Sequence, residues 1–190
     1  MRSLAHFCRY MLRLDPPQSQ VTDRELGLLL DHAKDAETIC EIGCFEGRTC
    51  VALAEVTKGR VYSVDPFVSG RVGICYGEWI ARSHIRRKGL KNVRLLRGFS
   101  ADVAPSFDRP IDLLFIDANH SYEFVRQDWE LWSPKVREGG RIAMHDCKPT
   151  ANSPSYLGSM KFYEEDIPRI SGAQEVDSVD SLVVLKVKRA

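Results

Sequence analysis

Polar side chains stand at the ends of successive apolar segments of this chain, where they could bind a ligand. Asp65 and Asp117 each end such a segment, the pair His145 and Asp146 ends a third, and a fourth leads to Ser100. In an open α/β sheet, ligands bind beyond the carboxyl ends of the strands. A carboxylate at such an end can accept hydrogen bonds from both hydroxyls of a ribose, each contributing roughly 1.5–3 kcal/mol. We therefore expect Asp65 to bind a ribose.

A turn with two glycines precedes these residues in the chain. Residues 38–47 are mostly apolar or β-branched up to Gly43, which predicts a buried strand, and Gly47 opens a helix. The spacing is Gly-x-x-x-Gly, with Glu41 two residues ahead of the first glycine. A dinucleotide fold would have Gly-x-Gly-x-x-Gly instead. The turn therefore predicts a ligand loop of another kind and argues against a nicotinamide dehydrogenase.

Composition narrows the class of protein and its partners. The 190 residues include 27 lysines and arginines against 26 aspartates and glutamates, so no global field favours nucleic acid or an anionic membrane. No apolar stretch approaches the roughly 20 residues of a transmembrane helix. The six cysteines form no Cys-x-x-Cys pair, which favours buried reduced thiols. We expect a cytoplasmic protein with a small-molecule partner, no nucleic acid and no membrane, while a homo-oligomer stays open.

Strand and helix patterns alternate along the chain, which favours a parallel sheet because parallel neighbours need long crossovers. Thr22 and Glu25 fit a capping box at the start of a helix, and Ser121 can cap another. A tight turn near Asp180 predicts a final antiparallel hairpin. We expect strands at 38 to the glycine turn, 60–65, 92–97, 111–117, 141–146, 173–177 and 181–188, and helices at 3–14, 22–33, 47–58, 70–89, 122–132 and from about 158 to 170, with a short turn or helix at 100–107.

With these elements in place, the chain resembles the class I S-adenosylmethionine-dependent methyltransferases over about residues 20–190. Residues 41–47 are similar to the methionine-binding loop of that family, Asp65 to its ribose acid, and 100–101 to its adenine-side turn. The resemblance implies one α/β domain, 1–190, with a Rossmann-like, mostly parallel, doubly wound sheet of seven strands, a C-terminal antiparallel hairpin and helices on both faces. Residues 1–35 would form helices over the active site, and 36–190 the core. The implied cofactor-binding residues are Glu41, Gly43, Cys44, Phe45, Gly47, Asp65, Pro66, Ser100, Ala101 and Asp117.

Two further segments, 115–123 and 139–146, resemble small-molecule O-methyltransferases that bind a divalent cation, including sugar-modifying members of antibiotic pathways. This resemblance implies Asp117, His145 and Asp146 as metal ligands and His120 as general base, with Asp117 also catalytic. His145 departs from the family pattern, which often has an acid there, and imidazole is a poor ligand for Mg²⁺. Either His145 orients Asp146, or the metal is manganese, iron or zinc, or no metal is bound.

The expected function is methyl transfer from S-adenosylmethionine to a hydroxyl of a small molecule, such as a sugar, a phenol or a natural product. Mg²⁺ or another divalent cation is a further cofactor that the resemblance allows. Two alternatives remain. One is a non-catalytic S-adenosylmethionine-binding module, and the other is a metal-dependent, hydroxylase-like enzyme on the same fold, because histidines and carboxylates can form an iron site. The acceptor depends on residues 1–35, 68–90 and 147–160, whose packing the sequence does not reveal.

Overall fold

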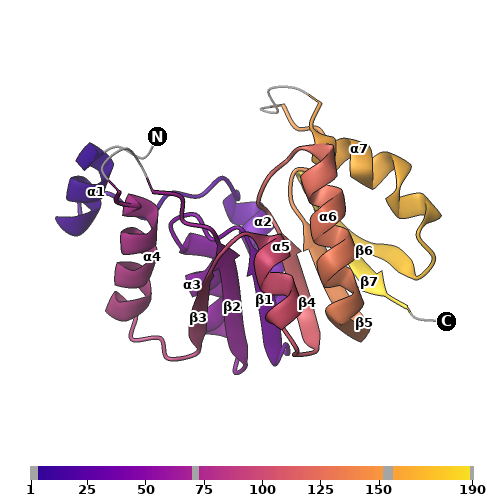
Figure 1. The fold of residues 1–190 in the computed structure, drawn as a ribbon, viewed down its shortest axis with the longest axis horizontal. Coiled ribbons are helices and arrows are strands. Elements are labelled where there is room, and N and C mark those ends of the chain that lie inside the picture. The colour runs from indigo at the N-terminus through magenta and orange to yellow at the C-terminus, as the bar shows by residue number, and fades with distance from the viewer. Residues whose placement is uncertain (1–3, 70–72, 152–155, 189–190) are drawn as a thin grey trace.

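A seven-stranded sheet forms the central layer of the protein. The computed structural model describes residues 4–69, 73–151 and 156–188. The strands of these residues are β1 Thr38–Ile42, β2 Arg60–Asp65, β3 Val93–Arg97, β4 Ile111–Ile116, β5 Val136–Met144, β6 Ala173–Val179 and β7 Leu182–Val187. Their order in the sheet is β3-β2-β1-β4-β5-β7-β6, and Figure 1 shows helices on both sides of it.

The pairing of the strands confirms the expected doubly wound α/β sheet. β1 pairs in parallel with β2 and β4, β2 with β3, and β4 with β5. β7 runs antiparallel to both β5 and β6, and Asp180 turns the hairpin with a φ of +49°. The strand order reverses between β1 and β4, which is where ligands bind in sheets of this kind.

Helices bury an apolar layer against each face of the sheet. On one face lie α2 Asp23–Ala33, α3 Arg48–Val56 and α4 Tyr76–Arg87. On the other lie α5 Ser100–Val103, α6 Tyr122–Trp132 and α7 Gly158–Glu165, with the short 3-10 turns Ala104–Ser106, Ser133–Lys135 and Ile167–Arg169. β4 is buried along its whole length between the two layers. β4 therefore lies at the centre of the core, and its carboxyl end can position a site.

The two N-terminal helices pack against different parts of the protein. Helix α1, Leu4–Met11, packs on α4, where the Phe7 and Tyr76 rings lie 5.1 Å apart. α2 packs on α3 and begins with the predicted capping box of Thr22 and Glu25. The segment between α1 and α2 passes the carboxyl ends of the strands, where Gln18 lines a cavity. None of the described helices is long and apolar enough to cross a membrane.

Several element boundaries differ from the expected ones, and backbone conformation explains them. α1 ends at Met11 because Arg13 has a φ of +62°, and α4 begins at Tyr76 rather than 70 because Gly73 has a φ of +73°. Residues 3 and 70–72, which the expected helices included, lie outside the described residues. β5 starts at Val136 and stops before His145.

Ser121 does not cap α6 as predicted. It occupies the position before the helix, but its hydroxyl donates a hydrogen bond to Asn119 Oδ1 and makes no bond to the helix amides. The competing side-chain bond stabilises the turn between β4 and α6, a common behaviour of serine outside helices. This turn carries His120 of the predicted site.

Candidate functional site

The turn between β1 and α3 has the geometry of a ligand loop. Gly43 has a φ of +102°, and a Cβ atom there would lie 2.0 Å from the carbonyl oxygen of Asp117. Gly47 has a φ of +78° and stands directly before α3. Because only glycine avoids strain and collision at the first position, the turn can approach the end of β4 closely. The glycine pattern of the sequence is thus explained by backbone conformation and close approach.

Asp65 at the end of β2 holds this turn in place. Its Oδ2 accepts hydrogen bonds from the backbone amides of Cys44 and Phe45, each 3.0 Å long, and its Oδ1 accepts one of 2.7 Å from Phe67. Asp65 is half-buried and also lines the adjoining cavity. The carboxylate therefore fixes the conformation of the loop. The predicted hydrogen bonds to a ribose would be a second role of the same side chain.

Glu41 does not face the cavity. It is fully buried, and Ser63 on the neighbouring strand donates a hydrogen bond to it. Burial raises the pKa of Glu41 well above its usual value, and the neighbouring Cys44 raises it further. Glu41 therefore lies behind the loop, and it is not among the residues that line the adjoining cavity.

A cavity of about 360 Å³ opens in front of the turn; we call it the glycine-turn cavity. Seven of the ten predicted cofactor residues line it, whereas Glu41, Gly47 and Ala101 do not. The seven are Gly43, Cys44, Phe45, Asp65, Pro66, Ser100 and Asp117. The other lining residues were not predicted from the sequence, and they include Gln18, Ser19, Gln20, Phe99, Phe124 and Asp128.

Asp128 lies at the α6 side of the glycine-turn cavity. It is 3% exposed, and the hydroxyl of Ser100 donates a hydrogen bond to its carboxylate. Burial raises the pKa of Asp128 to about 6, and the bond from Ser100 opposes part of that rise. Two aromatic rings of this cavity, Phe99 and Phe124, are 59% and 50% exposed and flank its mouth. These residues carry no motif, because they come from separate elements that meet only in the fold.

Next to this cavity lies a cluster of four residues, which we call the His/Asp cluster: Asp117, His120, His145 and Asp146. One ligand atom from each lies within 4.8 Å of the others. His145 Nδ1 is 3.2 Å from Asp117 Oδ1 and 3.4 Å from Asp146 Oδ2. His120 Nε2 is 3.5 Å and 3.4 Å from the same two oxygens. The structure thus brings together all the residues predicted as metal ligands and the predicted base.

The two imidazole nitrogens of the His/Asp cluster are unusual because they lack hydrogen bonds. His120 Nε2 and His145 Nδ1 are both buried, and neither has a hydrogen-bond partner among the residues that the structure describes. Buried polar atoms are rarely left so, and such atoms point to an ion or water. Neighbouring donors bound to a tetrahedral cation at about 2.0–2.1 Å would lie roughly 3.3 Å apart. The spacings of 3.2 and 3.4 Å between His145 Nδ1 and the two carboxylates therefore fit a cation bound by these three residues.

The charges of the cluster without an ion favour protonated imidazoles. Burial lowers the pKa of His145, but the carboxylates of Asp117, Asp146 and Glu25 outweigh it and raise the pKa to about 12. The Asp117 carboxylate also raises the pKa of His120, against an opposing effect of burial. A dication would take over the role of these protons in neutralising the two aspartates.

Glu25 completes the surroundings of His145, and sequence reasoning did not include it in the site. Its Oε2 accepts a 3.1 Å hydrogen bond from His145 Nε2 and one of 2.9 Å from the backbone of Thr22. Its Oε1 accepts bonds of 3.0 and 2.6 Å from the backbone and hydroxyl of Ser181. Burial opposes ionisation, yet His145, Ser181 and Thr22 together lower the pKa of Glu25. It is therefore a buried carboxylate with every contact satisfied.

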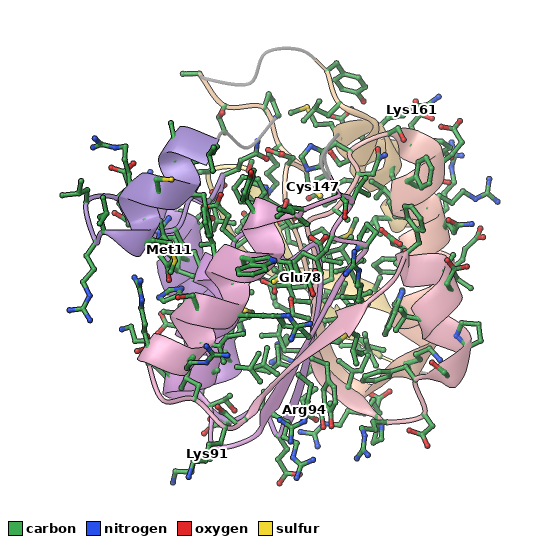
Figure 2. The ribbon with its side chains drawn as sticks, turned by 60° about the vertical axis from the view of Figure 1, so that its left-hand side comes forward. Met11, Glu78, Lys91, Arg94, Cys147 and Lys161 are labelled. Carbon is green, nitrogen blue, oxygen red and sulfur yellow. The ribbon has the colours of Figure 1, made fainter. Side chains whose placement is uncertain are left out.

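A second cavity of about 610 Å³ opens on the other side of the His/Asp cluster; we call it the histidine cavity. It is lined by Gln20, Thr22, Glu25, His120, His145, Asp146, Thr150, Ala151, Leu157, Asp180 and Ser181. Figure 2 shows Cys147, which follows the cavity residue Asp146 in the chain, in the upper half of the view, and Lys91 and Arg94, at the start of β3, near the bottom. Both cavities therefore lie at the carboxyl ends of the strands.

Comparisons with known proteins agree with this architecture. A family model described as a methyltransferase domain matches residues 40–147, which is more than half of the chain. An uncharacterized protein of Acanthamoeba polyphaga mimivirus is 28% identical over 147 residues, covering 70% of this chain and 62% of that protein. The chain thus spans less than two thirds of this curated relative's length.

Two solved structures share the fold. The O-methyltransferase TomG from Streptomyces achromogenes, involved in tomaymycin synthesis and solved with S-adenosylmethionine, has a TM-score of 0.68 at 20% identity, covering 98% of this chain and 89% of its own. An O-methyltransferase from Bacillus cereus, solved with S-adenosylhomocysteine, has a TM-score of 0.69 at 21% identity, covering 97% and 90%. The chain belongs to the methyltransferase domain family, and its fold is that of the class I S-adenosylmethionine-dependent methyltransferases.

Proposed function

We propose that the protein transfers a methyl group from S-adenosylmethionine to a hydroxyl of a small polar molecule, with a divalent cation held by the His/Asp cluster. The observation that carries the proposal is the position of Asp117, which lines the glycine-turn cavity and also belongs to the cluster. A donor in that cavity would lie beside the groups that handle the acceptor. Aligning nucleophile, methyl carbon and sulfur can supply roughly 7–11 kcal/mol of the barrier.

The glycine-turn cavity has the features that the donor requires. Gly43 lets the turn lie against the end of β4, and Asp65 and Ser100 offer carboxylate and hydroxyl oxygens in the wall of the cavity. Its volume of about 360 Å³ lies within the range of small-molecule sites, roughly 300–1,000 Å³. The two structural neighbours described above hold the donor or its product, which supports this assignment.

The His/Asp cluster would activate the acceptor. Asp117, His145 and Asp146 would hold the cation, because their donor atoms face one another and one nitrogen has no hydrogen bond. When bound, the cation supplies Lewis acidity that lowers the pKa of the acceptor hydroxyl. His120, whose Nε2 faces both carboxylates, would accept the proton during transfer.

The histidine cavity favours a polyhydroxylated acceptor. Its wall carries the carboxylates of Asp146, Asp180 and Glu25, and the hydroxyls of Thr22 and Ser181. Among the described residues that line it, none is a lysine or an arginine. A neutral or cationic sugar-like molecule would find hydrogen-bond partners there, whereas an anionic acceptor would meet like charge.

A two-part experiment tests the proposal. Calorimetry with S-adenosylhomocysteine measures occupation of the glycine-turn cavity, and we expect one site per chain. Turnover of methyl-labelled S-adenosylmethionine is then measured with polyols, aminosugars, phenols and phosphorylated sugars, with Mn²⁺ or Mg²⁺ and with a chelator. The proposal predicts product from the first two classes, lost on chelation and restored by metal. Absence of S-adenosylhomocysteine binding refutes the donor site, while full turnover in chelator refutes the metal.

A further inference from the structure

Glu25 is a buried acid that the mechanism above does not use. It is 1% exposed and lies in the first turn of α2, outside the matched segment 40–147. As the residue at position N3 of the helix, which closes the capping box, Glu25 needs only one oxygen to accept the Thr22 amide. Burying a carboxylate for this bond alone is costly, because an exposed glutamate caps a helix equally well. The contacts of Glu25 with His145 and Ser181 therefore need an explanation other than helix capping.

The contacts of Glu25 divide between its two oxygens. Among the described residues, Oε1 accepts its hydrogen bonds from Ser181, at the turn before β7, and so joins α2 to the C-terminal hairpin. Oε2 binds the Nε2 of His145 at 3.1 Å. The other nitrogen of that ring, Nδ1, faces Asp117 Oδ1 and Asp146 Oδ2 and has no hydrogen bond within the described part of the chain.

We propose that Glu25 is a positioning residue for the metal centre: it holds the proton of His145 on Nε2 and so presents the lone pair of Nδ1 to a cation between Asp117 and Asp146. The inference rests on the metal centre of the proposed function. Metal-binding histidines commonly donate their second ring N–H to a carboxylate, which fixes the tautomer and the ring orientation. Here that carboxylate comes from the N-terminal helix rather than from the sheet.

The arrangement also determines which cations fit. Nδ1 of His145 adds a nitrogen to the oxygens of Asp117 and Asp146. Imidazole suits Zn²⁺, Fe²⁺ and Co²⁺, whereas Mg²⁺ prefers oxygen ligands alone. The centre should therefore bind Co²⁺ or Zn²⁺ more tightly than Mg²⁺, and the difference should shrink when Glu25 no longer orients the ring.

Calorimetric titration of the full chain with Co²⁺ tests the role of Glu25. Glu25→Gln, which keeps the shape but not the charge, should weaken Co²⁺ binding by about 10- to 100-fold. Asp31→Asn is the matched control, because it removes the charge of an exposed carboxylate on the same helix and should change the Co²⁺ affinity less than threefold. In a His145→Ala background the same Glu25→Gln substitution should have no effect on Co²⁺ affinity, since a residue that acts through another shows this coupling.

A measurement on the wild type keeps the proposal testable if the Glu25 variant does not fold. Long-range ¹H–¹⁵N NMR spectra of the protein with Zn²⁺ should show His145 bound through Nδ1 and protonated on Nε2. Binding through Nε2, or a Glu25→Gln variant that folds and binds Co²⁺ like the wild type, would overturn the role of Glu25 alone. A wild type that binds neither ion would remove the metal centre from the proposed function as well.

Discussion

Asp65 gives the most direct test of the glycine turn, because its carboxylate serves three backbone amides. Two of these bonds, from Cys44 and Phe45, end on Oδ2, and the third, from Phe67, ends on Oδ1. In Asp65→Asn, only one of the two side-chain positions remains an acceptor, so at least one amide loses its partner. An unpaired amide costs about 1–3 kcal/mol. Asp65→Ala removes all three bonds, and we expect a loss of at least ~3 kcal/mol in the free energy of unfolding.

Urea unfolding followed by tryptophan fluorescence measures this loss, with exposed Asp102→Asn as the control that should change stability by less than about 0.5 kcal/mol. Calorimetry with S-adenosylhomocysteine measures the second role of Asp65. Loss of a charged hydrogen bond to the ribose should weaken binding roughly 10- to 150-fold in Asp65→Ala. Equal unfolding free energies for wild type and Asp65→Ala would refute the anchoring argument, and equal affinities would refute the ribose contact.

Three further predictions use other features of the site. Gly43→Ala should cost more than ~3 kcal/mol in urea unfolding, since its Cβ would meet a backbone oxygen at 2.0 Å, whereas Gly89→Ala, with open space around it, should cost only the ~1–2 kcal/mol of its positive φ. Burial raises the pKa of Asp128 from 3.8 to about 6, so this carboxyl holds its proton to a higher pH in the folded protein than in the unfolded chain. The free energy of unfolding should therefore fall as the pH rises from about 4 to 6. Asp128→Asn should flatten that slope and raise the unfolding free energy at pH 7 by up to ~3 kcal/mol. His120→Ala should lower kcat by about 10²- to 10⁴-fold while the affinity for S-adenosylhomocysteine stays within twofold, and His32→Ala, whose ring lies on α2, should change neither.

The sheet and the glycine turn were predictable because they depend on local patterns. Apolar strands ending in polar groups fix which end of a parallel sheet carries the ligand, and the seven-strand order then brings the ends of β1, β2, β4 and β5 together. Asp117 after β4 and the pair His145 and Asp146 after β5 meet for this reason. Their roles toward a ligand stay predictions.

The sequence analysis assigned Glu41 to the cofactor site, although the neighbouring strand indicates that its side chain points to the other side of the turn. Side chains alternate along a strand, and Glu41 pairs in register with Ser63 of β2. A serine in the middle of an otherwise apolar strand indicates a polar partner behind the sheet. The acid therefore points away from the cavity that the neighbouring turn creates.

Glu25 and Asp128 could not have been found from the sequence. The capping box already accounts for Glu25, so nothing in the local pattern calls for a second role. Its contact with His145 depends on how α2 packs against a strand end 120 residues away. Asp128 is one acid in a charged helix until Ser100 and the cavity wall are placed beside it.

The bonds between α2 and the last hairpin also bear on how the chain folds. Glu25 and Ser181 are 156 residues apart, and Arg24 forms a 2.7 Å ion pair with Asp180 in the same turn. Contacts between such distant residues form late, because closing a long loop costs entropy before the contact can repay it. During synthesis, Ser181 must emerge before it can bind Glu25, which requires nearly the whole chain. If the proposed metal centre binds a cation, its affinity should therefore develop only once α2 and the C-terminal hairpin have met, and metal binding would report on the native arrangement of both ends of the chain.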